Sequence, residues 1–474
     1  MVIVDNNFNK LLIEQRLEII SNLEKKFLNV TLSEEQIQAL LSIIEFIHSN
    51  DTEFVLSGSA GTGKSLITKL IVRYLEQINR NYLLATPTNK ACGVLSKYTE
   101  RSVTTLHKLL YLKPSIDILK LDFKDLQWST ESSSSDIPIL GIIIIDECSM
   151  INSVLYDFII EKVNAKGSKV IFVGDSKQLY PVKEHTLSKP FQCKNKFELT
   201  QIHRQSNSNP ILNVLSELRY RSLNKFSEIN SEFGNLRIYK HWRELLNNNI
   251  NLFKEAVKTK NPELIKLLAY TNRRVEAFNN VIRKSVFEDD LEYHIGEILM
   301  GYDNSNSGVS IMNSEEFVVL NKWQTSLRIG FVYVSGYTLK LKSLNNDTEA
   351  GEVFIISRDN SKETFESIAA YLETLRLDAI NCKNKRMQGK LWKDYFSVVD
   401  SFLTPYDLVF EDRIVRKKSI DYGYCISVHK SQGSNYDNVL VDMNNLFICN
   451  NKEELRQLQY VALSRTRNNV SLLM

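Results

Sequence analysis

The chain has 474 residues, of which 43% are hydrophobic and 24% are charged, and its net charge at neutral pH is +3. This composition is typical of a water-soluble globular protein, and the loose rule of about 150 residues per domain indicates two to four domains. No apolar run approaches the roughly 20 residues of a membrane span, and the first residues, MVIVDN, do not begin a secretory signal. The mild positive charge permits a nucleic-acid partner without arguing for one, so that question depends on motifs.

The six cysteines are scattered along the chain, and none forms a C-x-x-C pair. Zinc sites and disulfide frameworks depend on closely spaced cysteines, so neither is expected, and a reducing cytoplasm is the default location. The cysteines are Cys92, Cys148, Cys193, Cys382, Cys425 and Cys449.

The first 50 residues predict two helices. Residues 1–30 show an amphipathic pattern, which is typical of a packed N-terminal helix and less often of a docking element. A second helix is expected from about 33 to 49, with Ser33 as its cap. Gln36 is either an ordinary surface residue of this helix or an amide that recognises adenine through paired hydrogen bonds.

Residues 58–65, GSAGTGKS, fit the phosphate-loop pattern G-x-x-x-x-G-K-[ST], with a strand-like run before them and a helical pattern after them. Glycines let backbone N–H groups approach a polyphosphate, and the helix N-terminus adds partial positive charge. The lysine can then reach the β- and γ-phosphates, while the serine hydroxyl ligates Mg²⁺. The predicted nucleotide site consists of Gly58, Ser59, Ala60, Gly61, Thr62, Gly63, Lys64 and Ser65.

The next strand, at 82–85, ends in small hydroxyl residues, and a similar segment leads to His107. Ligand contacts gather at the carboxyl ends of strands in an open α/β sheet, so these hydroxyls are candidates for holding a nucleic-acid phosphate. Each segment taken alone is more often a plain helix cap. Residues 109–135 interrupt the alternation of strands and helices, and they predict a β-hairpin with strands near 110–115 and 118–123.

Four consecutive isoleucines at 142–145 predict a strand buried on both faces, and Asp146 and Glu147 follow directly. Paired acids in this position fit the second half of a nucleotide-hydrolysing site, in which Asp146 holds Mg²⁺ and Glu147 deprotonates the attacking water. The next buried strand, 170–173, leads to Gln178, which is either a turn cap or a sensor of the γ-phosphate.

A second α/β unit begins near residue 210, with a strand at 265–270, and it resumes after about 420. Between about 296 and 420, short β-branched runs suggest a small β-barrel, followed by a charged helical segment. Trp392 in that segment is surrounded by lysines, and its ring belongs either to a base-stacking platform or to the core of a small subdomain.

The ordered set of motifs resembles the superfamily 1 DNA helicases, in particular their RecD-like, 5′-to-3′ branch. The matching pieces run from residue 31 to the C-terminus and leave residues 1–30 and much of 330–420 outside. Besides the phosphate loop they are ATPTNKA at 85–91, TLH at 105–107, DECSM at 146–150, GDSKQLYPV at 174–182, HRQ at 203–205, LAYTN at 268–272, VHKSQGS at 428–434 and YVALSRTR at 460–467.

The resemblance implies an α/β fold of two RecA-like lobes that bind ATP and Mg²⁺. The expected domains are an N-terminal extension (1–30), a first lobe (31–195) with a hairpin insertion at about 108–135, a second lobe (196–295 and 420–474), and an inserted subdomain (296–419) with an SH3-like barrel and a helical segment.

The resemblance also assigns roles to single residues. Arg204 and Arg465 would be arginine fingers that stabilise γ-phosphate charge in the transition state. Gln432 and Gly433 would couple nucleotide binding to strand binding. The residues that resemble a grip on single-stranded DNA are Thr86, Pro87, Thr88, His107, His429 and Lys430.

The resulting hypothesis is a 5′-to-3′ DNA helicase that acts on single strands and on junctions with duplex, functions as a monomer, and works with replication or repair proteins but no membrane. The alternative is a nucleic-acid translocase or binding switch whose nucleotide state controls affinity without processive unwinding. RNA as a substrate also stays open, because grips on the backbone distinguish the sugars poorly unless they contact the 2′-OH.

Overall fold

The structure is a computed structural model that describes residues 31–115, 127–130, 135–181, 184–201, 210–306, 310–344 and 350–474. The chain divides into two compact units, which are Met1–Leu112 with Thr130–Tyr220, and Lys113–Ser129 with Arg221–Met474. The predicted helix over residues 1–30 lies outside the described residues.

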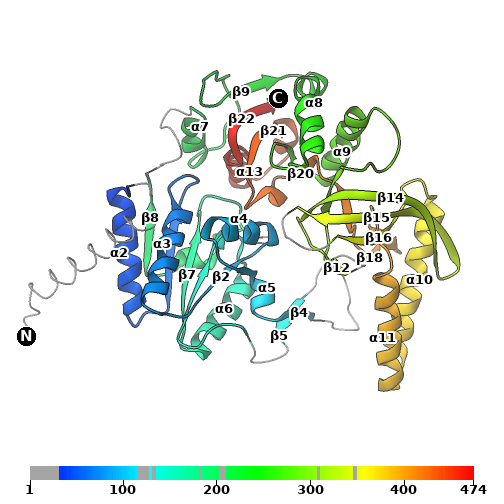
Figure 1. Cartoon of the computed structure of the whole chain (residues 1–474), viewed down its shortest axis with the longest axis horizontal. Coiled ribbons are helices and arrows are strands. Elements are labelled where there is room, and N and C mark those ends of the chain that lie inside the picture. Colours follow the sequence, from blue (N-terminus) through cyan, green and yellow to red (C-terminus); the bar gives the residue numbers. More distant parts are fainter. Residues whose placement is uncertain are drawn as a thin grey trace, which may run out of the picture. The chain divides into compact units, whose positions relative to one another are not determined.

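The first unit is built on a six-stranded parallel sheet in the order β3-β2-β6-β7-β1-β8 (Figure 1). The last strand extends past the lobe boundary that we expected at 195, because β8 pairs with β1 along its whole length. The strands are β1 (Glu53–Gly58), β2 (Tyr82–Thr86), β3 (Val103–Thr105), β6 (Ile142–Ile145), β7 (Lys169–Gly174) and β8 (Lys196–Leu199).

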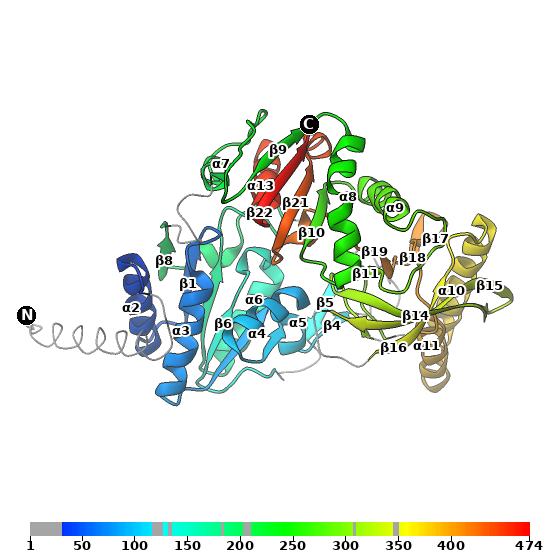
Figure 2. The same cartoon turned by 45° about the horizontal axis from the view of Figure 1, so that its top comes forward.

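Helices cover both faces of this sheet. Alternate residues of its central strands point to opposite sides, and both faces carry apolar side chains that need covering. Ile171 and Val173 of β7 join the core under α2 and α3, whereas Phe172 packs against Tyr156 of α6 with 5.9 Å between ring centroids. Figure 2 shows α3, α4 and α6 against the strands. The helices of this unit are α2 (Glu34–His48), α3 (Lys64–Gln77), α4 (Asn89–Thr99), α5 (Leu106–Leu109), α6 (Ser153–Ala165) and α7 (Ile211–Leu218), with short 3-10 turns at Cys148–Met150 and Lys189–Gln192.

The predicted hairpin is present in part as a two-stranded sheet of β4 (Leu112–Ser115) and β5 (Gln127–Thr130). Its first strand falls where we expected it, whereas the second strand expected at 118–123 lies wholly on residues outside the described part. We expected the hairpin to belong to the first domain, but Lys113–Ser129 groups with the second compact unit.

The second unit contains a five-stranded parallel sheet in the order β20-β10-β21-β22-β9. Its strands come from both sides of the insertion, and the two parallel sheets confirm the predicted α/β fold with two RecA-like lobes. The strands are β9 (Leu236–Tyr239), β10 (Ile265–Ala269), β20 (Cys425–Ser427), β21 (Tyr436–Asp442) and β22 (Thr466–Leu473), and the helices are α8 (Trp242–Thr259), α9 (Asn272–Phe287), α12 (Met443–Leu446) and α13 (Lys452–Ser464).

The insertion in this unit is an antiparallel sheet in the order β16-β15-β14-β11-β19, followed along the chain by a pair of long helices. These strands join in a row, and the SH3-like barrel stays a prediction. The elements are β11 (Ile298–Gly301), β14 (Glu316–Ile329), β15 (Val332–Ser343), β16 (Gly351–Ile356), α10 (Lys362–Asn381), α11 (Lys385–Val399) and β19 (Ile420–Tyr422), with short pairs β12 (Ser305–Asn306) and β13 (Ser310–Ile311), and β17 (Leu408–Phe410) and β18 (Arg413–Arg416).

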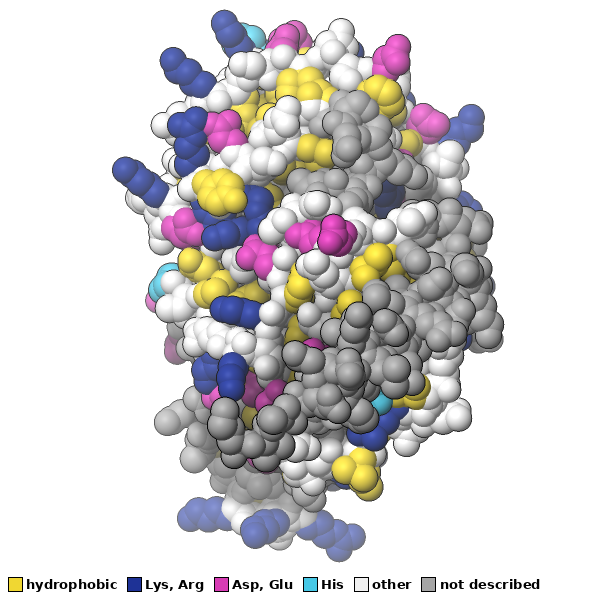
Figure 3. All heavy atoms as spheres, turned by 90° about the vertical axis from the view of Figure 1, so that its left-hand side faces the viewer, with side chains coloured by type: hydrophobic (Ala, Val, Ile, Leu, Met, Phe, Trp, Pro, Cys, Tyr) yellow, Lys and Arg dark blue, Asp and Glu magenta, His cyan; other side chains and the backbone are white. Residues whose placement is uncertain are grey.

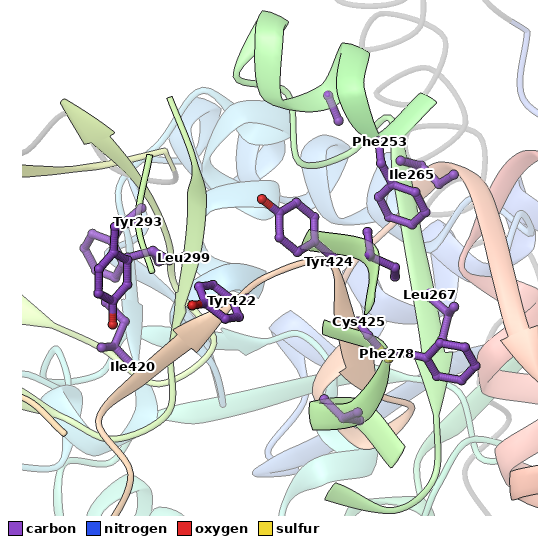
Figure 4. Close-up of a cluster of buried hydrophobic side chains, with 14 of the residues drawn as sticks. Phe253, Ile265, Leu267, Phe278, Tyr293, Leu299, Ile420, Tyr422, Tyr424 and Cys425 are labelled. Atoms are coloured by element: carbon purple, nitrogen blue, oxygen red, sulfur yellow. The ribbon is translucent and has the colours of Figure 1, made fainter. Parts of the chain in front are cut away.

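The insertion shares one hydrophobic core with the second parallel sheet. Figure 4 shows Tyr422 and Tyr424 between the side chains of the insertion, such as Leu299, and those of the parallel sheet, such as Leu267. Within the described part of the chain, no helix is long and apolar enough to cross a membrane.

Candidate nucleotide and nucleic-acid sites

The phosphate loop leads from β1 into α3 as the sequence predicts. Gly61 and Gly63 take left-handed backbone conformations, with φ of 88° and 93°, which glycine adopts without a steric penalty. Gly63 is also the N-cap of α3, and no side chain caps this helix. The N-terminus of α3 is therefore arranged as an anion-binding site, with its dipole pointing its positive end into the loop.

Lys64 lies over this loop. Its Nζ donates hydrogen bonds to the carbonyl oxygens of Gly58 at 2.7 Å and Ser59 at 3.0 Å. Ser65, the next residue, is exposed on the first turn of α3. The ammonium and the hydroxyl therefore flank the uncapped helix end from two adjacent positions.

Gln36 supports the loop from α2. Its side chain is 3% exposed, and its Nε2 donates to the carbonyl oxygen of Thr62 at 3.2 Å. Its Oε1 accepts from the backbone N–H of Ser33 at 3.1 Å, within the capping box that begins α2. A Cβ on Gly63 would lie 2.3 Å from Gln36 Nε2. Gln36 thus positions the loop, a role that the sequence did not suggest, and adenine recognition stays a prediction.

Asp146 and Glu147 follow β6 at the carboxyl end of the sheet, as predicted. Burial and then the charge of Glu147 raise the pKa of Asp146 to about 7, and the positive charge of Lys64 opposes this rise. The backbone N–H of Glu147 donates to Asp146 Oδ1 at 2.9 Å, and Glu147 itself has a left-handed backbone with φ of 56°. The fold therefore brings the lysine of the phosphate loop and the acid pair into one electrostatic environment.

Gln178 lies behind the acid pair and is 5% exposed. Its Oε1 is 3.5 Å from the hydroxyl of Ser149, in the turn that follows Glu147. The nearby Asp175 is 1% exposed and pairs with Arg219, whose Nη1 lies 3.4 Å from its Oδ1. Ser149 and Arg219 were not predicted, because a serine in a short turn and an arginine at the end of a helix give no distinctive sequence signal.

The candidate DNA residues of the first unit divide into buried and capping groups. Thr86 is fully buried, and its hydroxyl donates to the carbonyl oxygen of Thr88 at 2.8 Å. Thr88 caps α4 by accepting from Ala91 N at 3.2 Å, which is the ordinary structural role expected of such a residue. Burial lowers the pKa of His107, so it is neutral at physiological pH. A DNA-binding role for these residues and for Pro87 stays a prediction.

In the second unit, Arg465 is joined to the segment that holds Gln432 and Gly433. The guanidinium is 4% exposed, and it donates to the carbonyl oxygen of Ser434 at 3.3 Å and to the hydroxyl of Ser464 at 2.9 Å. Gly433 has a φ of 72°. The Nε2 of Gln432 is a buried donor without a hydrogen-bond partner among the described residues. Buried amide donors are nearly always hydrogen-bonded, and a bound ligand would supply the missing acceptor.

Lys430 is held by two residues of the insertion that the sequence did not suggest. Its Nζ donates to Asn313 Oδ1 at 2.6 Å and lies 4.0 Å from the centre of the Tyr302 ring. Burial and the nearby charge of Lys418 lower the pKa of Lys430 to about 8. Burial also lowers the pKa of His429, whose ring lies 6.2 Å from that of Tyr270.

Two predicted residues do not contribute to these groups. Arg204 lies outside the described residues. Trp392 is half-buried in the core between α10 and α11, where its ring centroid is 5.6 Å from that of Tyr395. Of the two interpretations of Trp392, its packing favours the subdomain core over an exposed stacking platform.

Two protein-family models match this chain, and they match it in the order that the motifs predict. A model described as an AAA domain matches residues 31–233, and one described as a UvrD-like helicase C-terminal domain matches residues 422–473. Both cover segments with the predicted site residues.

Relatives align along most of the chain. The ATP-dependent DNA helicase dda of Enterobacteria phage T4 is 25% identical over 458 residues, which cover 93% of this chain and 98% of the relative. An uncharacterized protein of Acanthamoeba polyphaga mimivirus is 27% identical, with 89% and 96% covered. The ATP-dependent DNA helicase Pif1 of Campylobacter jejuni is 25% identical, with 90% and 89% covered.

Among solved structures, the Pif1 helicase from Bacteroides in complex with ADP-AlF3 and ssDNA aligns with 94% of this chain and 92% of its own, at a TM-score of 0.47 and 17% identity. The two family models and the alignment with helicase relatives over about nine-tenths of the chain agree with the motif order. The chain resembles the RecD-like ATP-dependent DNA helicases, among them the phage helicase Dda.

Proposed function

We propose that the protein hydrolyses ATP with Mg²⁺, moves 5′-to-3′ along single-stranded DNA, and unwinds duplex DNA ahead of it. The observation that carries this proposal is the uncapped glycine loop with Lys64 over it, in the same electrostatic environment as Asp146 and Glu147. A protein that only binds nucleotide has no need of this hydrolytic set. The direction of movement rests on the family resemblance.

The residues of the first unit fit Mg-ATP. The positive-φ glycines and the uncapped end of α3 suit a polyphosphate, and Ser65 and Asp146 would hold the metal. Bound Mg-ATP supplies the phosphoanhydride bond whose hydrolysis drives the motor. Lys64 neutralises charge on the phosphates, and Glu147 takes the proton from the attacking water.

The second lobe contributes residues that respond to the nucleotide. Arg465, with Arg204, would stabilise the charge that develops on the γ-phosphate. The unpaired amide of Gln432 and the adjoining Gly433 would pass the nucleotide state to His429 and Lys430 on the strand. The remaining strand contacts in this proposal are Thr86, Pro87, Thr88 and His107, and the expected partners are single strands, junctions and proteins of replication or repair.

The test compares two partial duplexes, one with a 5′ single-stranded tail and one with a 3′ tail, each incubated with Mg-ATP. The Lys64→Ala variant is the control for the motor. We expect unwinding of the 5′-tailed substrate alone, and no turnover in the variant.

Each other outcome rejects a defined part of the proposal. Activity only on the 3′ tail would overturn the direction. If neither substrate is unwound while single-stranded DNA still stimulates hydrolysis, the protein is a translocase or a switch. Equal stimulation by RNA would overturn the choice of DNA, and turnover retained in Lys64→Ala would overturn the site itself.

A further inference from the structure

The segment from residue 381 to 393, which ends α10 and begins α11, concentrates positive charge. It contains five cations and no acidic residue, although the net charge of the whole chain is only +3. The rest of the chain is therefore slightly negative, and this segment is a local excess. The cations are Lys383, Lys385, Arg386, Lys390 and Lys393.

Three of these cations share one face of α11. Arg386, Lys390 and Lys393 are spaced by four and then three residues, which places them on one stripe of a helix. Trp392 and Tyr395 lie on the other side of α11 and pack into the core of the helical pair. The stripe therefore faces solvent. Figure 3 shows that Lys and Arg side chains also gather at the lower edge of the face that it draws.

The five cations are exposed, and within the described residues none of them forms an ion pair. Other cations of the same helical pair are paired. Lys362 lies 3.1 Å from Glu366, and Arg376 lies 2.5 Å from Glu373. The stripe therefore keeps a net positive charge, with one exposed acid, Asp394, a helical turn beyond Lys390.

The charges do not serve the stability of α11. Lys385 and Arg386 occupy its first turn, which has no acidic residue, and cations there interact unfavourably with the helix dipole. Binding to an external anion would compensate this cost.

We propose that the α11 basic stripe, Arg386, Lys390 and Lys393 with Lys383 and Lys385 beside it, binds the phosphate backbone of duplex DNA. The stripe spans about 10 Å along the helix. A duplex presents one negative charge per roughly 1.7 Å, so several phosphates match this length. Surfaces that bind single strands usually add stacked aromatic rings, and the Trp392 ring is turned into the core instead. The choice of DNA rests on the proposed function, whereas the charge match does not.

The test measures binding of the full chain to a blunt-ended duplex by fluorescence anisotropy over a range of salt concentrations. The variant carries Arg386→Gln, Lys390→Gln and Lys393→Gln, because glutamine keeps the helix propensity of the original residues. The matched control carries Lys240→Gln, Lys258→Gln and Lys260→Gln, which are exposed cations of the same unit. Hydrolysis of ATP stimulated by single-stranded DNA is measured in parallel.

We expect the stripe variant to bind the duplex more weakly and with a smaller salt dependence. Each lost phosphate contact lowers the slope of log affinity against log salt by about 0.9, so three contacts lower it by about 2.7. The control and the stimulated hydrolysis should not change. An unchanged slope and affinity in the stripe variant would overturn the proposal.

Two further outcomes distinguish this proposal from an acidic protein partner and from the proposed helicase function. If the variant keeps duplex binding but loses binding to poly-glutamate, the stripe docks an acidic protein and the duplex proposal is wrong. If the unaltered protein shows no hydrolysis stimulated by DNA, the proposed helicase function fails, while the anisotropy measurement still decides whether the stripe binds duplex.

Discussion

The two parallel sheets of this chain use the same strand-to-helix turn in opposite ways. In the first unit, β1 passes through the phosphate loop into α3, and in the second unit β10 passes through Tyr270 and Thr271 into α9. Neither helix has a side-chain cap of its own, but the turn before α9 is held by a distant residue. There, Asn445 Oδ1 accepts hydrogen bonds from Tyr270 N at 2.8 Å and Thr271 N at 2.9 Å.

The difference shows what makes such a turn a nucleotide site. Asn445 is 6% exposed and is itself fixed by Asp442, whose Oδ1 accepts from Asn445 N at 3.2 Å. Its amide oxygen takes backbone donors that a phosphate would otherwise use. The first turn keeps its donors for a ligand because glycines, rather than a neighbouring side chain, shape the loop.

The largest expected effect comes from Glu147→Gln in the first unit. Removing a general base lowers turnover by about 10²–10⁴-fold, and the isosteric amide leaves the fold and nucleotide binding in place. Steady-state hydrolysis and equilibrium binding of a labelled nucleotide measure the two quantities. A variant that retains more than a tenth of the turnover would show that Glu147 is not the base.

Gly63→Ala tests whether the loop depends on glycine. The left-handed backbone at φ of 93° disfavours alanine by about 1–2 kcal/mol, and the new Cβ would lie 2.3 Å from Gln36 Nε2. Together these effects should weaken nucleotide binding by at least about tenfold.

Adding Gln36→Ala to Gly63→Ala separates the two causes. The double variant removes the contact and keeps the backbone strain, so it should recover part of the affinity. Recovery that is complete would show that strain contributes nothing, and equal losses in both variants would show that the contact contributes nothing.

Asn445→Ala tests the opposite turn. It leaves the partly buried N–H groups of Tyr270 and Thr271 without their acceptor, and each lost hydrogen bond costs about 0.5–1.5 kcal/mol. We expect a lower midpoint in denaturant unfolding of the second unit and unchanged nucleotide affinity. A loss of nucleotide affinity as large as that of Gly63→Ala would contradict the division of roles between the two turns.

Patterns that depend on local sequence were predictable. The Ser33 cap, the phosphate loop and the buried strand before Asp146 all lie where the sequence placed them, because each depends on neighbours within a few residues. The two sheets were predictable from the alternation of strands and helices together with the family resemblance.

Contacts between distant segments were not predictable. The bond from Gln36 to the loop joins residues 26 apart, and the bond from Lys430 to Asn313 joins residues 117 apart. Neither Gln36 nor Asn313 belongs to a pattern that specifies its partner. The pairing of β8 with β1 beyond residue 195 was not predictable for the same reason, since it is set by tertiary packing rather than by local propensity.

The smallest expected effect concerns Lys430 of the second unit. Burial and Lys418 lower its pKa to about 8, while Asp303 acts in the opposite direction, and Tyr302 and Asn313 hold the ammonium in place. Below pH 8 the side chain is charged and attracts a phosphate, whereas above pH 8 it is neutral. Binding of single-stranded DNA should therefore weaken a few-fold between pH 7 and pH 9, as the charged fraction of the lysine falls from about nine-tenths to about one-tenth.

Two variants sharpen this prediction. Lys430→Gln should bind more weakly at pH 7 and lose the pH dependence, because no titrating group remains at that position. Tyr302→Leu removes the ring beside the ammonium and should weaken binding at pH 7 while the pH dependence persists. If Lys430→Gln keeps the full pH dependence, another group titrates in this range, and Lys430 does not provide the charge that the strand contacts.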